Sequence, residues 1–86
     1  MKAIKTTNEF FKDLKKHGFS ASLIEVLNCL SNDLPLPEKF KDHQLKGKLK
    51  QYRECHVKPD LLLVYEVLDD DIKLVALDSH SNLFKN

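Results

Sequence analysis

The chain has 86 residues, 42% of them hydrophobic and 31% charged, and a formal net charge of +1 at pH 7. Its length fits one small domain spanning residues 1–86, and its composition is that of a globular protein rather than a disordered or fibrous one. The sequence has neither the roughly 20 consecutive apolar residues of a membrane span nor the apolar stretch of a signal peptide. Two cysteines are too few for a disulfide framework or for a zinc site of their own. These features predict a cytoplasmic protein that does not insert into a membrane.

Charge is divided unevenly along the chain. Between Glu38 and Lys58 seven basic residues stand against three acidic ones, a net of +4, whereas between Asp60 and Asp78 six acidic residues stand against one lysine, a net of −5. A basic segment of that density favours a polyanionic partner such as a nucleic acid. Lysine-rich loops are also often simply solvated, so charge alone leaves both interpretations open.

The first half of the chain begins with a candidate strand at residues 2–5. Thr6 and Glu9 then have the spacing of a capping box, which marks the start of a helix. Apolar residues at helical spacing predict a helix over Thr7–His17, and Gly18 is placed to end it in a left-handed conformation.

A second helix is predicted over Ser20–Ser31, where the apolar residues again follow the helical period. The segment Leu34–Pro37 contains two prolines, each of which holds the preceding residue extended, so it is predicted to be a stiff connector. The side chains expected in the core are Leu14, Leu23, Val26, Leu27, Leu30, Leu63 and Tyr65.

The second half has the pattern of strands joined by turns. Strands are predicted at residues 52–57, 61–65 and 72–77, and the continuously apolar segment 61–65 is typical of a central strand covered on both faces. Two helices followed by such strands predict an α+β fold, in which the two N-terminal helices pack on one face of a small antiparallel β-sheet.

Three histidines of the second half, His43, His56 and His80, are candidates for acid–base chemistry together with Asp60. We expect the strands to bring these four side chains to a common rim of the sheet. Histidine titrates near neutral pH, so a cluster of this kind supplies both a general base and a general acid. A single histidine in a strand is more often structural, so the interpretation depends on the whole group.

A metal site is not predicted. Cys55 and His56 are adjacent, so on a strand they point to opposite faces and cannot both bind one metal ion. The sequence also lacks the common metal-binding spacings and a glycine-rich phosphate loop. Cys55 is expected to face the core as a small hydrophobic residue rather than to act as a nucleophile.

Three motifs follow one another in the second half. Residues 41–47 contain Asp-His-x-Leu-x-Gly, residues 52–65 contain Arg-x-x-His-x-x-Pro-Asp before an apolar run, and residues 79–84 read Ser-His-x-x-Leu-Phe. In this combination and order they resemble the YafQ branch of the RelE-type bacterial toxins. The resemblance covers about residues 34–84, while the N-terminal part matches only in its pattern of strand, helix and helix.

The resemblance implies a RelE-like, microbial RNase-type fold and a toxin of a type II toxin–antitoxin system. Such a toxin is an endoribonuclease, or mRNA interferase, that cuts messenger RNA on the translating ribosome and is neutralised by a cognate antitoxin protein. No metal or other cofactor is implied. In this reaction the ribose 2′-OH attacks the adjacent phosphorus and the 5′-oxygen leaves with a proton, which restricts the substrate to RNA.

The resemblance also implies roles for particular residues. His80 is expected to be the general acid and His43 the general base, while His56 and Asp60 orient groups or hold the attacking hydroxyl. Phe84 is expected to stack on a base, as aromatic rings do without demanding a particular sequence. The basic residues expected to contact the substrate are Lys48, Lys50 and Arg53.

Ala76 departs from the family pattern, because relatives carry an arginine four residues before the final histidine. Arginine suits a phosphorane, so its absence weakens the expected electrostatic stabilisation. Three explanations stay open: an engineered inactivation, a naturally weakened member, or replacement by a lysine such as Lys48 or Lys50. Simple alternation puts Leu74 and Ala76 on one face of their strand and Val75 and Leu77 on the other.

Two alternatives to an endoribonuclease also stay open. The same fold serves toxins that inhibit DNA gyrase by binding, and a basic domain of this size could bind RNA without cutting it. The histidine set favours cleavage, because a pure gyrase inhibitor does not need it. The missing arginine keeps binding without cleavage in consideration.

Overall fold

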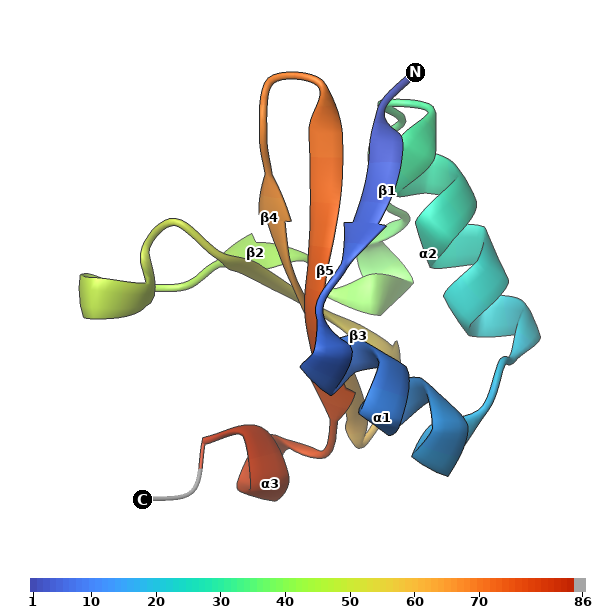
Figure 1. Cartoon of the computed structure of the whole chain (residues 1–86), viewed down its shortest axis with the longest axis vertical. Coiled ribbons are helices and arrows are strands. Elements are labelled where there is room, and N and C mark those ends of the chain that lie inside the picture. Colours follow the sequence, from blue (N-terminus) through green and yellow to red (C-terminus); the bar gives the residue numbers. More distant parts are fainter. Residues whose placement is uncertain (85–86) are drawn as a thin grey trace.

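The computed structural model describes residues 1–84, which form a five-stranded sheet and three α-helices (Figure 1). In chain order the elements are β1 (Ala3–Thr6), α1 (Asn8–His17), α2 (Ala21–Ser31), the 3₁₀ helix η1 (Glu38–Phe40), β2 (His43–Gln44), the 3₁₀ helix η2 (Gly47–Leu49), β3 (Arg53–Lys58), β4 (Leu61–Val67), β5 (Asp71–Asp78) and α3 (His80–Leu83). Over those residues no helix is long and apolar enough to cross a membrane. The predicted α+β fold class is confirmed.

The strands lie side by side in the order β1-β5-β4-β3-β2. Strands β2 to β5 pair antiparallel, as expected for the second half of the chain. At one edge β1 instead runs parallel to β5, with Ile4 opposite Ile72. This edge departs from the expected antiparallel arrangement, because a strand of four residues carries no sequence signal for its partner.

Both long helices begin at a hydroxyl side chain. The Oγ1 of Thr7 accepts the N–H of Phe10 at 3.0 Å, and the Oγ of Ser20 accepts the N–H of Leu23 at 3.2 Å. The predicted capping box is therefore wrong by one residue, since Thr6 still belongs to β1. The predicted helices exceed the observed ones only by these cap residues.

Gly18 ends α1 as predicted. Its N–H donates to the carbonyl of Leu14 at 2.7 Å. Its φ of 74° lies in the region that favours glycine, but its ψ of 177° is extended, so the left-handed helical conformation expected there does not form.

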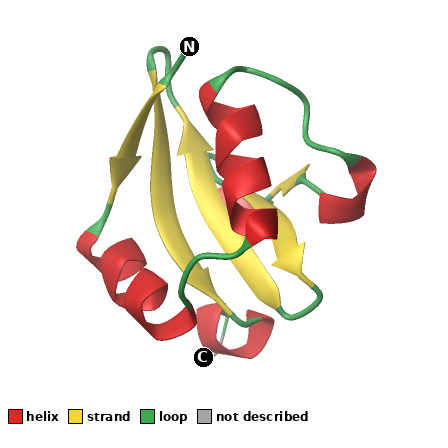
Figure 2. Ribbon diagram, turned by 90° about the vertical axis from the view of Figure 1, so that its right-hand side faces the viewer, coloured by secondary structure: helices red, strands yellow, loops and turns green. Residues whose placement is uncertain are grey.

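The core lies between the sheet and the two helices α1 and α2, which cover the same face (Figure 2). Phe10 of α1 and Leu23, Val26 and Leu30 of α2 pack against the inward side chains of β3, β4 and β5. The predicted core is confirmed: Leu23, Val26, Leu30, Leu63 and Tyr65 are buried, and Leu14 and Leu27 are partly buried against them.

A β-bulge interrupts the pairing of β4 with β5. Val64 lies opposite Ala76, while the next residue of β4 lies opposite Leu74, so Val75 is the extra residue. The bulge turns both Leu74 and Leu77 toward the helices, where they are 1% and 0% exposed. The alternation that placed Leu74 and Ala76 on one face is therefore wrong. Ala76 lies on the other side of the sheet, which we call the open face.

Candidate active site

One row of neighbouring residues crosses the open face. His43 of β2 lies opposite Glu54 of β3, Glu54 lies opposite Val64 of β4, and Val64 lies opposite Ala76 of β5. Residues directly opposite each other on adjacent strands point to the same side of a sheet. The sheet register thus places His43, Glu54 and Ala76 on one line, and His56 follows Glu54 on the same face of β3.

The Glu54 carboxylate lies between two histidines. Its Oε1 is 3.4 Å from Nε2 of His43 and 4.0 Å from Nε2 of His56, and its side chain is 6% exposed. His43 holds its ring through Nδ1, which lies 2.9 Å from the carbonyl oxygen of Lys41. With Nδ1–H donating to that carbonyl, Nε2 is the ring nitrogen that faces Glu54 and can accept a proton. This group, His43, Glu54 and His56, is the histidine–glutamate cluster.

Asp60 and His80 lie near the end of the sheet at which β3 turns into β4 and β5 leads into α3 (Figure 1). Both side chains are exposed. The His80 ring lies beside Phe84, with ring centroids 5.0 Å apart. Within residues 1–84 no hydrogen bond or ion pair joins Asp60 or His80 to the histidine–glutamate cluster, so their share in one site stays a prediction.

Asp78 fixes the start of α3, where His80 stands. Its Oδ1 accepts the N–H of Ser79 at 2.8 Å and Nδ2 of Asn82 at 3.1 Å, and lies 3.0 Å from Nε2 of His17. Partial burial acts to raise the pKa of the Asp78 carboxyl, but the hydrogen bonds from Asn82, Ser79 and His17 outweigh it and lower the pKa to about 2. The ionised carboxylate therefore ties α1 and α3 together.

Arg53 faces away from the cluster. Its Nη2 donates to Oδ2 of Asp42 at 2.8 Å, and the hydroxyl of Tyr65 donates to Oδ1 of the same carboxylate. The hydrogen bond to Asp42 raises the pKa of Arg53, while burial and then the Asp42 carboxylate raise the pKa of Tyr65. This polar network joins the segment before β2 to β3 and β4. A contact of Arg53 with substrate stays a prediction, as do those of the exposed Lys48 and Lys50.

Cys55 lies in the core as predicted, with 0% of its surface exposed. Burial, and after it the nearby carboxylates of Asp42 and Glu54, raises the pKa of the thiol to about 12. A thiol that stays protonated and buried is a poor nucleophile, so the site depends on the other side chains.

An apolar cavity of about 200 Å³ lies at the other end of the cross-strand row. Tyr52, Ala76 and Phe84 line it, together with Val64 and aliphatic side chains of the segment around η2. Position 76 therefore faces the open side, and the small alanine leaves this space unfilled. Phe84 is placed where a base could stack.

Glu54 was not among the site residues predicted from the sequence. Its spacing of two from His56 put both on one strand face, and that signal was readable. The pairing of Glu54 with His43 could not be predicted from the sequence, because β2 has only two residues and its register depends on the whole sheet.

The fold and the open-face site define a class of small bacterial toxins with a RelE-like fold. A copper-bound mutant toxin from Helicobacter pylori has a TM-score of 0.92 and 46% identity, covering 98% of this chain and 100% of its own. YafQ in the Escherichia coli DinJ–YafQ complex has a TM-score of 0.84 and 34% identity, covering 98% of this chain and 99% of its own.

The chain belongs to the YafQ family, described as "Bacterial toxin of type II toxin-antitoxin system, YafQ", whose family model matches residues 2–85. It is 35% identical over 83 residues to the mRNA interferase toxin YafQ of Escherichia coli K12, across 96% of this chain and 85% of that protein. It is 44% identical over 62 residues to a putative toxin YafQ of Haemophilus influenzae, across 67% of this chain and 61% of that relative. The resemblance inferred from the three motifs is thus confirmed.

Proposed function

We propose that this protein is a ribosome-dependent endoribonuclease that cuts messenger RNA through the ribose 2′-OH. The observation that carries the proposal is the Glu54 carboxylate, buried between the Nε2 atoms of His43 and His56 on the open face. The Escherichia coli relative is named an mRNA interferase, which agrees with this chemistry. Because translating ribosomes are cytoplasmic, the proposed activity takes place in the cytoplasm.

The cluster supplies the base. Nε2 of His43 takes the proton of the 2′-OH, and Glu54 stabilises the resulting imidazolium by its negative charge. The 2′-oxygen forms a bond to the adjacent phosphorus while the bond from phosphorus to the 5′-oxygen breaks. His80 donates the proton that the 5′-oxygen needs to leave. The products are a 2′,3′-cyclic phosphate and a 5′-hydroxyl, so atoms and charges balance without a redox step.

The acid–base steps use only side chains of this protein. The Helicobacter pylori relative is a copper-bound protein, but within residues 1–84 of this chain no group of three or more His, Cys, Asp or Glu is arranged to hold a metal ion. The donor set therefore does not fit a resident metal, and no step is assigned to one.

Electrostatic stabilisation of the phosphorane is the weak part of this site. The neutral Ala76 occupies the position in the cross-strand row where the family resemblance calls for an arginine. Removal of one such group typically costs about 10²–10³ in rate. We therefore propose that the protein cleaves slowly.

A cognate antitoxin is the proposed protein partner. The Escherichia coli relative forms a DinJ–YafQ complex. Here the net charge of +4 between Glu38 and Lys58 favours an acidic and apolar antitoxin segment laid across the surface that RNA would use. Charge complementarity speeds association more than it sets affinity, so the association rate should fall with salt.

The test is translation in vitro of a defined message, with the 5′ ends of all fragments mapped. Cuts that appear only on translated message, with 5′-hydroxyl ends, support the proposal, and a 2′-deoxy substitution at a mapped cut should abolish that cut. His80→Ala should remove cleavage while the fold is retained. RNA binding with no cuts at any enzyme concentration would instead support a non-cleaving RNA-binding protein, and inhibition of gyrase supercoiling would support the gyrase alternative.

A further inference from the structure

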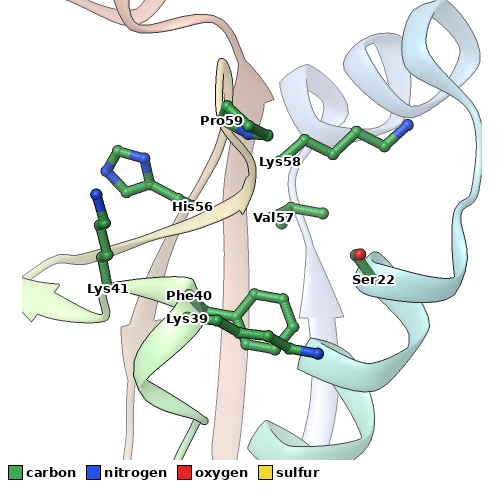
Figure 3. Close-up of a pocket in the computed structure, with 8 residues that line it drawn as sticks. All are labelled: Ser22, Lys39, Phe40, Lys41, His56, Val57, Lys58 and Pro59. Carbon is green, nitrogen blue, oxygen red and sulfur yellow. The ribbon is translucent and has the colours of Figure 1, made fainter.

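A second cavity, of about 330 Å³, lies beside His56, between α2, η1 and the end of β3 (Figure 3). Its lining is apolar at the base, where Phe40 and Val57 are 2% and 3% exposed. Around this base stand polar and basic side chains and one proline: Ser22, Lys39, Lys41, His56, Lys58 and Pro59. The cavity thus has a buried apolar base and a rim of mostly polar and basic side chains.

Two of the three rim lysines are available to an anion. Lys39 is already engaged, because its Nζ lies 3.2 Å from Oε1 of Glu25 and 5.0 Å from the centre of the Phe40 ring. Within residues 1–84 no carboxylate lies within 4.0 Å of the Nζ of Lys41 or Lys58. Figure 3 shows Lys41 extending toward the His56 ring.

His56 belongs both to this cavity and to the histidine–glutamate cluster, through its Nε2 at 4.0 Å from Glu54. An RNA strand whose reacting ribose lies at Glu54 therefore continues past His56 on one side. On the other side it meets the apolar cavity of Tyr52 and Phe84, which no cationic side chain of residues 1–84 lines. The two flanking cavities differ in chemistry: one suits a base, and the other suits a phosphate.

We propose that the cavity beside His56 is a subsite for the two RNA phosphates next along the strand from the one at which the chain is cut, and that Lys41 and Lys58 each bind one of them. This inference rests on the proposed function. Figure 3 shows the two ammonium groups on opposite sides of the cavity, so each meets its own phosphate, and the apolar base formed by Phe40 and Val57 lies under the ribose between them.

The experiment measures binding of a single-stranded RNA oligonucleotide in which every ribose is 2′-O-methylated, so that no cleavage occurs. Affinity is measured from about 50 to 200 mM salt for the wild type and for the double variant Lys41→Ala/Lys58→Ala. We expect the double variant to bind about tenfold more weakly at low salt. The slope of log K against log salt should fall by about 1.4, or about 0.7 for each lost contact to a single strand.

Lys5→Ala/Lys73→Ala is the matched control. These two lysines are exposed and lie opposite each other on β1 and β5, at the far edge of the sheet. The control also removes two positive charges, so a general electrostatic effect of net charge would weaken RNA binding equally in both double variants. We expect less than a twofold change in the control. Equal losses, or no loss in Lys41→Ala/Lys58→Ala, would overturn the proposal.

The outcomes separate the subsite from the proposed function. If the wild type fails to cut translated message but the Lys41/Lys58 variant still loses salt dependence, the subsite holds and the cleavage proposal fails. If the wild type cuts and the variant binds RNA normally, the subsite is wrong. Normal RNA binding with weakened binding of the antitoxin would assign the cavity to the protein partner and would also overturn the subsite. Lys41→Gln/Lys58→Gln repeats the test with the side chains kept long.

Discussion

A carboxylate lies at each face of β3, Asp42 from the segment before β2 and Glu54 from β3 itself, and the surroundings of the two differ sharply. On the helix-covered face Asp42 accepts short hydrogen bonds from Arg53, at 2.8 Å, and from Tyr65. On the open face the Oε1 of Glu54 lies 3.4 Å from Nε2 of His43 and 4.0 Å from Nε2 of His56. The Asp42 carboxylate accepts a hydrogen bond at each of its oxygens, whereas the contacts between the buried Glu54 carboxylate and the two histidines are longer.

This difference distinguishes a structural network from a reactive one. A fully hydrogen-bonded carboxylate holds elements together and gives little to a ligand. A buried carboxylate between two histidines suits proton transfer, because each histidine can gain or lose a proton near neutral pH. Substitutions on the open face should therefore change activity, and substitutions on the covered face should change stability.

The largest expected effect is on cleavage in Glu54→Gln. This change keeps the shape and removes the charge that stabilises the His43 imidazolium, so the rate should fall by about 10²–10⁴-fold. The free energy of unfolding should change little. Cleavage of a defined message and chemical denaturation measure the two quantities. Glu66→Gln, on the neighbouring β4, is the isosteric control and should keep full activity. Full activity in Glu54→Gln would mean that the charge of Glu54 takes no part in cleavage.

Ala76→Arg should raise cleavage by about 10²–10³-fold, the usual contribution of one preorganised cationic or hydrogen-bonding group. Position 76 lies two strands from Glu54 in the cross-strand row and opens into the 200 Å³ cavity, so the longer side chain has room on the open face. Ala76→Lys should gain less, because it lacks the planar guanidinium. Ala76→Leu fills the cavity without charge and should gain nothing.

Rates and thermal midpoints should be measured together for the three Ala76 variants. A well-folded Ala76→Arg protein with no gain in cleavage would show that position 76 is not the phosphate clamp. A gene that becomes toxic to its host after this single change would agree with the expected gain.

On the covered face the largest effect should come from Leu63→Ala. Leu63 is 0% exposed in the centre of β4, and truncation of such a side chain costs about 2–5 kcal/mol of unfolding free energy. Val67→Ala, at the end of the same strand, removes apolar surface that is already 48% exposed and should cost about 0.5 kcal/mol or less. An unchanged denaturation midpoint in Leu63→Ala would contradict the central position of this strand.

Most of the fold was predictable because local signals agreed with one another. Helical spacing and caps located α1 and α2 to within a residue, and the apolar run identified β4 as a central strand. The bulge at Val75 was not predictable, since no glycine or proline marks it and it depends on what packs beneath Leu74 and Leu77.

The site was predictable in its residue types but not in its arrangement. His43 and His56 carried an evident signal, but the position of Glu54 between them depends on a two-residue strand whose register is a tertiary property. The expected contact of Arg53 with the substrate stays a prediction. In the structure its guanidinium pairs with Asp42, because strand alternation turns Arg53 to the covered face.

Tyr65→Phe tests the covered-face network directly. The change removes one hydroxyl donor from the Asp42 carboxylate, and a hydrogen bond to a charged group contributes about 1.5–3 kcal/mol. We expect a loss of that size in unfolding free energy, with cleavage per folded molecule nearly unchanged. Tyr52→Phe is the control, since the Tyr52 hydroxyl makes no hydrogen bond to other residues of 1–84. A large loss of cleavage without a loss of stability would place Asp42 in the reaction instead.

The smallest effect concerns acid stability through Asp78. Its pKa, lowered to about 2 in the folded protein, lies below the value of about 3.9 for an unfolded chain. Above about pH 5 the carboxylate is ionised in both states and its stabilisation is fully present. As pH falls from about 5 toward 2 the unfolded state takes up the proton first, so this stabilisation is progressively lost. Urea denaturation at several pH values should therefore show a steeper acid decline in the wild type than in Asp78→Asn. Parallel declines would mean that Asp78 does not hold α1 and α3 through its charge.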